Sequence, residues 1–332
     1  MEILPGVHQI KVPNPTSDRV YLNSYLIQGK DGWLMVDTGW STDKAFDTVK
    51  DGLSDIGIDF TDIQEIVITH SHPDHYGLAD KIRELSKARL VLHQAEIPAA
   101  ASKFTNMQDF LEMMAQWLHK NGASDEDLPR LLEASPGMKA VRSFGVPDEF
   151  LNGSETISTG FFDFQVIWTP GHSPGHICLY ERDKKILLSG DHILPHITPN
   201  IGFAPWSGSN PLGSYLTSLK KLEGLDVDVV LPAHEWIFNG LVNRINELIH
   251  HHEQRKNNIL NAFGSASRTA FQIAFEIPWS VDGKETSFGD LSPIDKRMAI
   301  WETLAHLELL RAESEANSHE KEGTVFYTVM AS

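Results

Sequence analysis

The stretch Thr69-His70-Ser71-His72-Pro73-Asp74-His75 directly follows the apolar run EIVI at residues 65–68. Four side chains that commonly bind metals, three imidazoles and one carboxylate, fall within six residues. These donors suit borderline divalent ions, zinc above all, and a turn lets alternate residues point toward two neighbouring centres. Core packing does not explain so dense a cluster. The stretch therefore predicts a metal site, with a solvated histidine-rich turn as the alternative.

Short β-rich runs alternate with helical patterns from Val20 to about His234, which predicts a layered α/β domain. Five of these runs begin or end with an Asp or a His, so we expect polar side chains to converge on one edge of a rigid sheet. The predicted strands are YLNSYLI (21–27), GWLMVDTG (32–39), EIVITHSH (65–72), ARLVLH (88–93), FQVIWTPGH (164–172), HICLY (176–180), KILLSGD (185–191) and VDVVLPAHE (227–235).

These motifs, taken in order, resemble those of the metallo-β-lactamase superfamily. Its signature is His-x-His-x-Asp-His, followed by a distant His, a bridging Asp and a last His. The downstream motifs occur here as His172 in TPGHSPGH, Asp191 in LLSGD and His234 in LPAHE, and Asp37 in MVDTG occupies the upstream aspartate position. The resemblance covers roughly residues 5–245. It implies an α/β fold, the αββα sandwich of that superfamily.

The resemblance also assigns roles to residues. It implies two divalent metal ions, with zinc expected and iron or manganese as alternatives. One ion would be held by His70, His72 and His172, the other by Asp74, His75 and His234, and Asp191 would bridge them. Asp37 is similar to the aspartate that fixes the metal-binding loop, a task that orienting carboxylates perform for ligating histidines. A plain turn aspartate before Gly39 is its alternative role.

Two ions that share a bridging water lower its pKa enough to give a hydroxide nucleophile near neutral pH. Asp74 is the expected catalytic residue, which would orient that nucleophile or shuttle its proton. A bridging aspartate together with all the histidines resembles the glyoxalase II, lactonase and nuclease branches more than true β-lactamases. The leading hypothesis is therefore hydrolysis of a thioester of the acyl-CoA or acyl-glutathione type. The alternatives are a lactone or β-lactam hydrolase, a ribonuclease or other phosphodiesterase, a low-turnover binding or effector protein, and an iron-dependent sulfur dioxygenase.

Further histidines lie near these motifs. His176 stands four residues after His172, and the resemblance leaves it to support the loop. His192 and His196 follow the bridging aspartate and are candidates for substrate contact, with an ordinary loop role as the alternative. The run at 250–252 looks like a metal tract, but adjacent side chains on a helix point in different directions, which favours a solvated or packed role.

Two segments depart from the α/β pattern. The stretch from about 97 to 150 reads as a helical insertion, with an apolar stripe that is either a lid over a hydrophobic substrate or a face that packs on the core or a dimer partner. Helices predicted at Asn239–Ala262 and Ser292–Arg311, a polar turn at 314–323 and a β-like run at 324–330 suggest a winged-helix-like module with a packing or dimerisation role. We thus predict a catalytic domain at 1–245 and a C-terminal domain at 246–332. The stripe comprises Phe104, Met107, Leu111, Met114 and Leu118.

The amino-acid composition narrows the classes of molecule that the protein is expected to bind. The net charge of −17 weighs against nucleic-acid binding and favours a small-molecule substrate, with an acyl chain as one option. The single cysteine, Cys178, excludes an internal disulfide and fits a reducing compartment. The start lacks a signal-peptide pattern and no window is apolar enough for a membrane span, so we expect a cytoplasmic enzyme. A homodimer is the expected assembly for an enzyme with exposed apolar helices.

Overall fold

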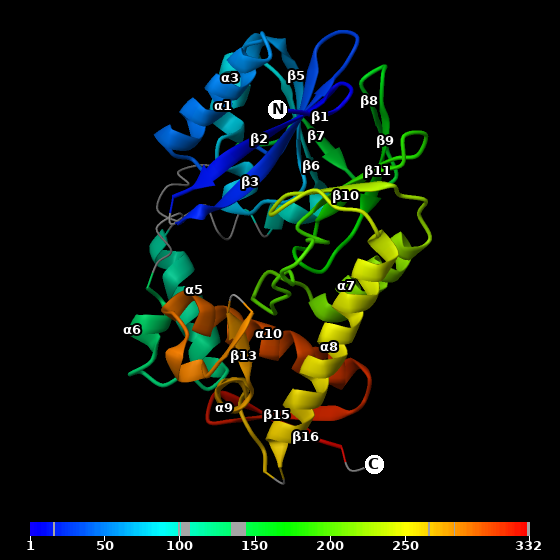
Figure 1. The fold of residues 1–332 in the computed structure, drawn as a ribbon. Helices are drawn as coiled ribbons and strands as arrows, with labels where there is room; N and C mark the ends of the chain where they lie inside the picture. The colour runs from blue at the N-terminus through cyan, green and yellow to red at the C-terminus, as the bar shows by residue number, and fades with distance from the viewer. Residues whose placement is uncertain are drawn as a thin grey trace.

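The computed structural model describes residues 1–330 except 16, 99, 101–106, 134–143, 265 and 282. Two β-sheets pack face to face, and helices cover the outer face of each (Figure 1). This arrangement confirms the predicted αββα sandwich. Within the described residues, no helix is both long and apolar enough to cross a membrane.

The first sheet has seven strands in chain order. Its first four strands are antiparallel, and β4 to β7 run parallel to one another. The strands are β1 (Glu2–Leu4), β2 (Val7–Asn14), β3 (Ser17–Gln28), β4 (Trp33–Val36), β5 (Ile63–Ile68), β6 (Arg89–His93) and β7 (Glu149–Leu151).

The second sheet has five strands in the order β12-β11-β10-β9-β8. Only β11 and β12 are parallel. The strands are β8 (Thr156–Ser158), β9 (Asp163–Trp168), β10 (Ile177–Glu181), β11 (Ile186–Gly190) and β12 (Val229–Pro232). All eight strands predicted from the sequence are therefore present, and the short β1, β7 and β8 and the longer β2 were missed.

A buried apolar layer fills the space between the sheets. Val67 and Val91 of the first sheet meet Leu179 and Leu188 of the second in this layer. Every residue of β10 and β11 is buried, because helices cover the face that points away from the first sheet. This double burial explains why these strands are continuous apolar runs rather than alternating ones.

Helices α1 (Asp43–Asp55) and α3 (Ala79–Ser86) cover the first sheet, and α7 (Pro211–Glu223) covers the second. The other helices are α2 (Pro73–Tyr76), α5 (Met107–Lys120), α6 (Leu128–Leu131), α8 (Leu241–Phe263), α9 (Ala270–Glu276) and α10 (Pro293–Ala312). Most of them form a helical lobe with the hairpins β13 (Trp279–Val281)–β14 (Lys284–Thr286) and β15 (Ala316–Lys321)–β16 (Thr324–Val329). Figure 1 shows α8 leading from the sheets down into this lobe.

Helix α8 crosses the predicted domain boundary at 245 without a break. Its first half packs on the second sheet through Leu241 and Ile245, and its second half enters the core of the helical lobe through Ile259 and Phe263. The division into two domains stays a proposal. The stretch 314–323, expected to be a turn, contains strand β15, because its backbone pairs across the hairpin with β16.

The predicted insertion contains α5 and α6, whose inner side chains join the core of the helical lobe. Met114 and Leu118 are fully buried, which agrees with a packing face. Leu111 is half-buried. Phe104 of the predicted stripe lies outside the described residues, and the side chain of Met107 does too.

Candidate metal centre

The predicted ligand residues follow strand ends at one edge of the two facing sheets. β4 and β5 are parallel neighbours, as are β11 and β12, so the loops after them emerge on the same side of their sheet. In chain order the residues are Asp37 directly after β4; His70 and His72 between β5 and α2; Asp74 and His75 within α2; His172 between β9 and β10; Asp191 directly after β11; and His234 two residues after β12.

Local sequence explains why the first motif points in two directions. His72 precedes helix α2 in an extended conformation, and Pro73 at the first helical position starts the turn of helix. The chain thus changes from extended to helical between His72 and Asp74. This change sends His70 and His72 to one group of side chains and Asp74 and His75 to another.

Three imidazoles converge in the first group. The Nδ1 atom of His72 lies 2.8 Å from His70 Nε2 and 2.9 Å from His172 Nε2. His172 donates its Nδ1–H to the backbone carbonyl of Asn200 at 2.9 Å, so its Nε2 lone pair faces the group. These three nitrogens lie within 4.8 Å of one another, as metal ligands require.

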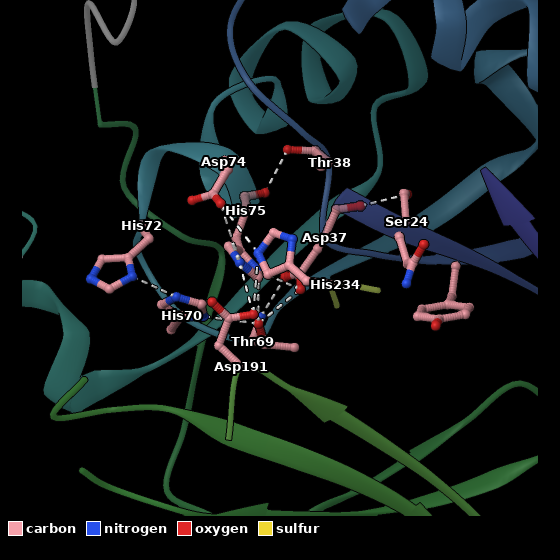
Figure 2. A network of polar contacts seen from close by, with 12 residues as sticks. Ser24, Asp37, Thr38, Thr69, His70, His72, Asp74, His75, Asp191 and His234 are labelled. Carbon is pink, nitrogen blue, oxygen red and sulfur yellow. Dashed lines mark hydrogen bonds and ion pairs between the residues drawn. The ribbon is translucent and has the colours of Figure 1, made fainter. Parts of the chain in front are cut away.

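The second group combines Asp74, His75 and His234, again with donor atoms within 4.8 Å. His234 donates its Nδ1–H to the carbonyl of Tyr21 at 2.9 Å, which turns its Nε2 toward Asp74 Oδ2 at 3.4 Å. Figure 2 shows these side chains pointing toward a common centre with His70.

Asp191 lies between the two groups. Its Oδ1 is 3.5 Å from His75 Nε2 and 3.3 Å from His234 Nε2, and its Oδ2 is 3.6 Å from His172 Nε2. Each carboxylate oxygen thus faces a different group. This is the placement that a shared ligand would need.

Asp37 holds the motif in place by accepting three hydrogen bonds. Its Oδ1 accepts the backbone N–H of Thr69 at 2.8 Å, and its Oδ2 accepts the Thr69 hydroxyl at 2.8 Å and the His75 Nδ1–H at 2.7 Å. The last contact directs His75 Nε2 into the second group. Asp37 has a backbone φ of 58°, in the left-handed region that aspartate tolerates better than most residues.

The charges and unpaired atoms of this cluster fit bound cations. His75 Nε2 and Asp191 Oδ1 are buried and have no hydrogen-bond partner within the described part of the chain, although buried polar atoms are normally paired. Burial lowers the pKa of His75, but the carboxylates of Asp37, Asp191 and Asp74 outweigh it and raise that pKa to about 10. These three carboxylates thus favour a positive charge at this point, which a bound divalent cation would supply. The donor set of imidazoles and carboxylates suits zinc and similar divalent ions.

The three other histidines near the motifs have different surroundings in the structure. His176 is buried; its Nε2 accepts the backbone N–H of Asp191 at 3.0 Å and its Nδ1 lies 2.8 Å from the Thr169 hydroxyl, so it supports two ligand loops. His192 is fully buried and packs edge-on against Tyr215, which favours a packing role over substrate contact. His196 is exposed and stacks near Trp236, and it stays our candidate for substrate contact.

One residue that supports this centre, Glu96, belongs to none of the sequence motifs. Glu96 is fully buried and bonds to both loops that carry the first group of ligands. In the structure Glu96 ends the short 3-10 helix Gln94–Glu96. A lone glutamate after a predicted strand forms no sequence motif, so the sequence did not indicate its role.

Comparison with known proteins agrees with this geometry. The model of the metallo-beta-lactamase superfamily matches residues 18–234, a span that contains every predicted ligand. The chain belongs to the metallo-beta-lactamase superfamily.

Relatives in this superfamily resemble the chain over its whole length. The Bacillus subtilis protein named "Probable metallo-hydrolase YqjP" is 26% identical, with 97% of each chain covered. The crystal structure of the Thermus thermophilus metallo-beta-lactamase family protein TTHA1429 superimposes with a TM-score of 0.83 and 28% identity, over 99% of this chain and 100% of that one. A beta-lactamase domain protein from Burkholderia ambifaria gives a TM-score of 0.78 and 26% identity, over 99% and 94%. The similarity to both structures extends through the helical lobe.

Proposed function

We propose that this metal-dependent hydrolase cleaves a thioester with an apolar acyl group, of the acyl-CoA or acyl-glutathione type. The hydrolase class follows from the superfamily and from the presence of its full set of ligand residues. The observation that carries the substrate proposal is an aromatic cluster between the helical lobe and the β11–α7 loop, whose Asn200 carbonyl accepts the His172 Nδ1–H. Lactones, β-lactams and phosphodiesters are the competing substrates.

The aromatic cluster joins the insertion to the metal loop. Phe110 of α5 stacks on Trp206 with ring centroids 5.5 Å apart, and Trp117 of α5 meets Phe203 edge-on at 5.3 Å. Both partners belong to the loop that includes Asn200, whose carbonyl accepts the His172 Nδ1–H. Trp301 of α10 closes the cluster against Trp206 at 6.0 Å. The loop that bonds to His172 thus also packs aromatic side chains against α5 and α10, and this packing beside a ligand-supporting loop supports the choice of an apolar acyl group.

The chain's own residues have distinct tasks in this reaction. His70, His72 and His172 would hold one ion, Asp74, His75 and His234 the other, and Asp191 would contact both. When bound, such ions supply Lewis acidity for the substrate carbonyl and lower the pKa of a water. The side chain of Asp74 is 20% exposed, against 11% for Asp191, which leaves Asp74 reachable from solvent. We therefore assign Asp74 the task of orienting the attacking water.

The test is turnover of a panel comprising an acyl thioester, a lactone, a β-lactam and a phosphodiester, with elemental analysis of the same preparation. We expect about two divalent ions per chain, with zinc as the expected metal, and thiol release that His72→Ala abolishes. His250→Ala is the matched control, because His250 is an exposed histidine of α8 outside the centre. Turnover of another panel member without thiol release would refute the thioester, and a single iron with oxygen consumption would instead indicate a sulfur dioxygenase.

A further inference from the structure

Glu96 lies outside every motif of the metal centre, yet it contacts both loops that carry the first group of ligands. It ends the short 3-10 helix that follows β6, at the start of the helical insertion. Its side chain is fully buried. It forms no ion pair with any lysine, arginine or histidine among the described residues. A buried carboxylate without a cationic partner must be stabilised by hydrogen bonds.

Those hydrogen bonds come from two segments about a hundred residues apart in the chain. Glu96 Oε2 accepts the backbone N–H of Ser71 at 2.8 Å and the Ser71 hydroxyl at 2.5 Å. Glu96 Oε1 accepts the backbone N–H of Gly175 at 2.6 Å. Ser71 stands between His70 and His72, and Gly175 stands three residues after His172. One carboxylate thus joins the two loops whose imidazoles converge.

The contact on the Gly175 side depends on the absence of a side chain. A Cβ atom at residue 175 would lie 2.7 Å from the backbone nitrogen of Glu96 and 2.8 Å from its Cγ. Both distances are shorter than van der Waals contact allows, and one of the atoms is backbone. Only glycine lets this loop approach closely enough for the hydrogen bond.

We propose that Glu96 is a positioning residue that sets the distance between the His70–His72 turn and the His172 loop, and so tunes the affinity of the metal ion held by these three histidines. This inference rests on the ligand assignment of the proposed function. Glu96 itself is not a ligand or a base, since both of its oxygens are occupied and it is shielded from solvent. Asp37 contacts His75 of the other group directly, and it reaches His70 only through the Thr69 hydroxyl.

The proposal predicts an effect on one ion only. Loss of a partner that orients metal ligands typically weakens metal affinity about 10- to 100-fold. Glu96→Gln keeps the shape, but its amide NH2 must face either the Ser71 N–H or the Gly175 N–H, and one donor then loses its acceptor. We expect the ion of His70, His72 and His172 to bind about 10-fold more weakly in Glu96→Gln and about 100-fold more weakly in Glu96→Ala. The other ion should change less than about threefold, because no hydrogen bond of Glu96 reaches its ligands.

The experiment titrates the metal-free full-length protein with zinc against a chromophoric chelator and with cobalt followed by its visible absorption. His72→Ala and His234→Ala identify the signal of each ion. Glu302→Gln is the matched control, because Glu302 is another largely buried carboxylate, which accepts from Arg255 at 3.0 Å in the helical lobe. Gly175→Ala is the second route to the same perturbation and keeps the carboxylate intact.

Selective weakening of the three-histidine ion in the Glu96 variants or in Gly175→Ala, with Glu302→Gln unchanged, supports the proposal. Unchanged affinities, or equal weakening of both ions together with a lower melting temperature, would overturn it and leave Glu96 a merely structural residue. A wild-type protein that binds no pair of ions would refute the ligand assignment itself. Thioester turnover does not enter this readout, so failure of the substrate proposal stays separate.

Discussion

Replacement of Asp37 by asparagine is the sharpest perturbation of the second ligand group. Asp37 is buried and accepts three hydrogen bonds, from the Thr69 N–H, the Thr69 hydroxyl and the His75 Nδ1–H. Asparagine has nearly the same shape but only one oxygen, so it satisfies either the Thr69 N–H or the His75 Nδ1–H. The other donor then points at an amide NH2 group. The Thr69 hydroxyl adapts, because it both donates and accepts.

The size of the effect follows from the lost contact. A buried donor without its acceptor costs about 1–3 kcal/mol, and loss of a partner that orients a metal-binding histidine costs about 10- to 100-fold in affinity. The second range corresponds to about 1.4–2.8 kcal/mol, so the two agree. We expect Asp37→Asn to lower the affinity for the ion held by Asp74, His75 and His234 by about 10- to 100-fold. The three-histidine ion should lose less affinity, because Asp37 reaches its ligand His70 only through Thr69, whose hydroxyl lies 3.1 Å from His70 Nδ1.

The assay is competition of the metal-free protein with a chelator of known zinc affinity, supported by urea unfolding of the same samples. Asp59→Asn is the control, because it removes the same charge at an exposed helix cap where asparagine is also a good capping residue. An Asp37→Asn protein that binds both ions within about twofold of wild type would contradict the assigned role. The aspartate would then be a turn residue whose hydrogen bonds do not reach the ligands.

Three further outcomes are expected. Chelation should abolish thiol release and lower the melting temperature in calorimetry, since ions at 100 times their dissociation constant stabilise the folded chain by about 2.7 kcal/mol; an unchanged melting temperature would speak against bound ions. Burial lowers the pKa of His306 to about 4, so the unfolded chain takes up its proton first, and stability should fall by up to about 3 kcal/mol as the pH drops from 6.5 to 4. Urea unfolding in the presence of a chelator should show a smaller loss of unfolding free energy between pH 6.5 and 4 for His306→Leu than for wild type. Equal losses in the two proteins would argue against this assignment. His196→Ala should raise KM for a thioester several-fold with kcat nearly unchanged, whereas a fall in kcat alone would place this exposed residue elsewhere in the mechanism.

Local patterns predicted the strands and the ligand motifs because both are short-range features. An apolar run such as KILLSGD predicts a buried strand, and it places Asp191 at the strand end regardless of the rest of the fold. The turn at His72 and Pro73 is equally local. Edge strands such as β7 and β8, three residues each, were missed since so short a run carries almost no periodicity.

Other features depend on contacts between distant segments. His192 and His196 look alike in the sequence, four residues apart, yet the first is buried against Tyr215 and the second is exposed. The aromatic contact of Phe110 with Trp206 joins residues almost a hundred positions apart, so the stripe of the insertion alone did not reveal its partner.

The order of residues along the chain was enough to predict which side chains are available for metal binding, the strand ends that carry them and the superfamily to which the chain belongs. The resemblance already predicted a supporting role for Asp37, but its contact with His75, across 38 residues, and the role of Glu96, which meets Gly175 across 79, came from the tertiary structure. Strand formation and turn geometry depend on neighbouring residues, whereas the partner of a buried charge depends on which loops the packed sheets bring together.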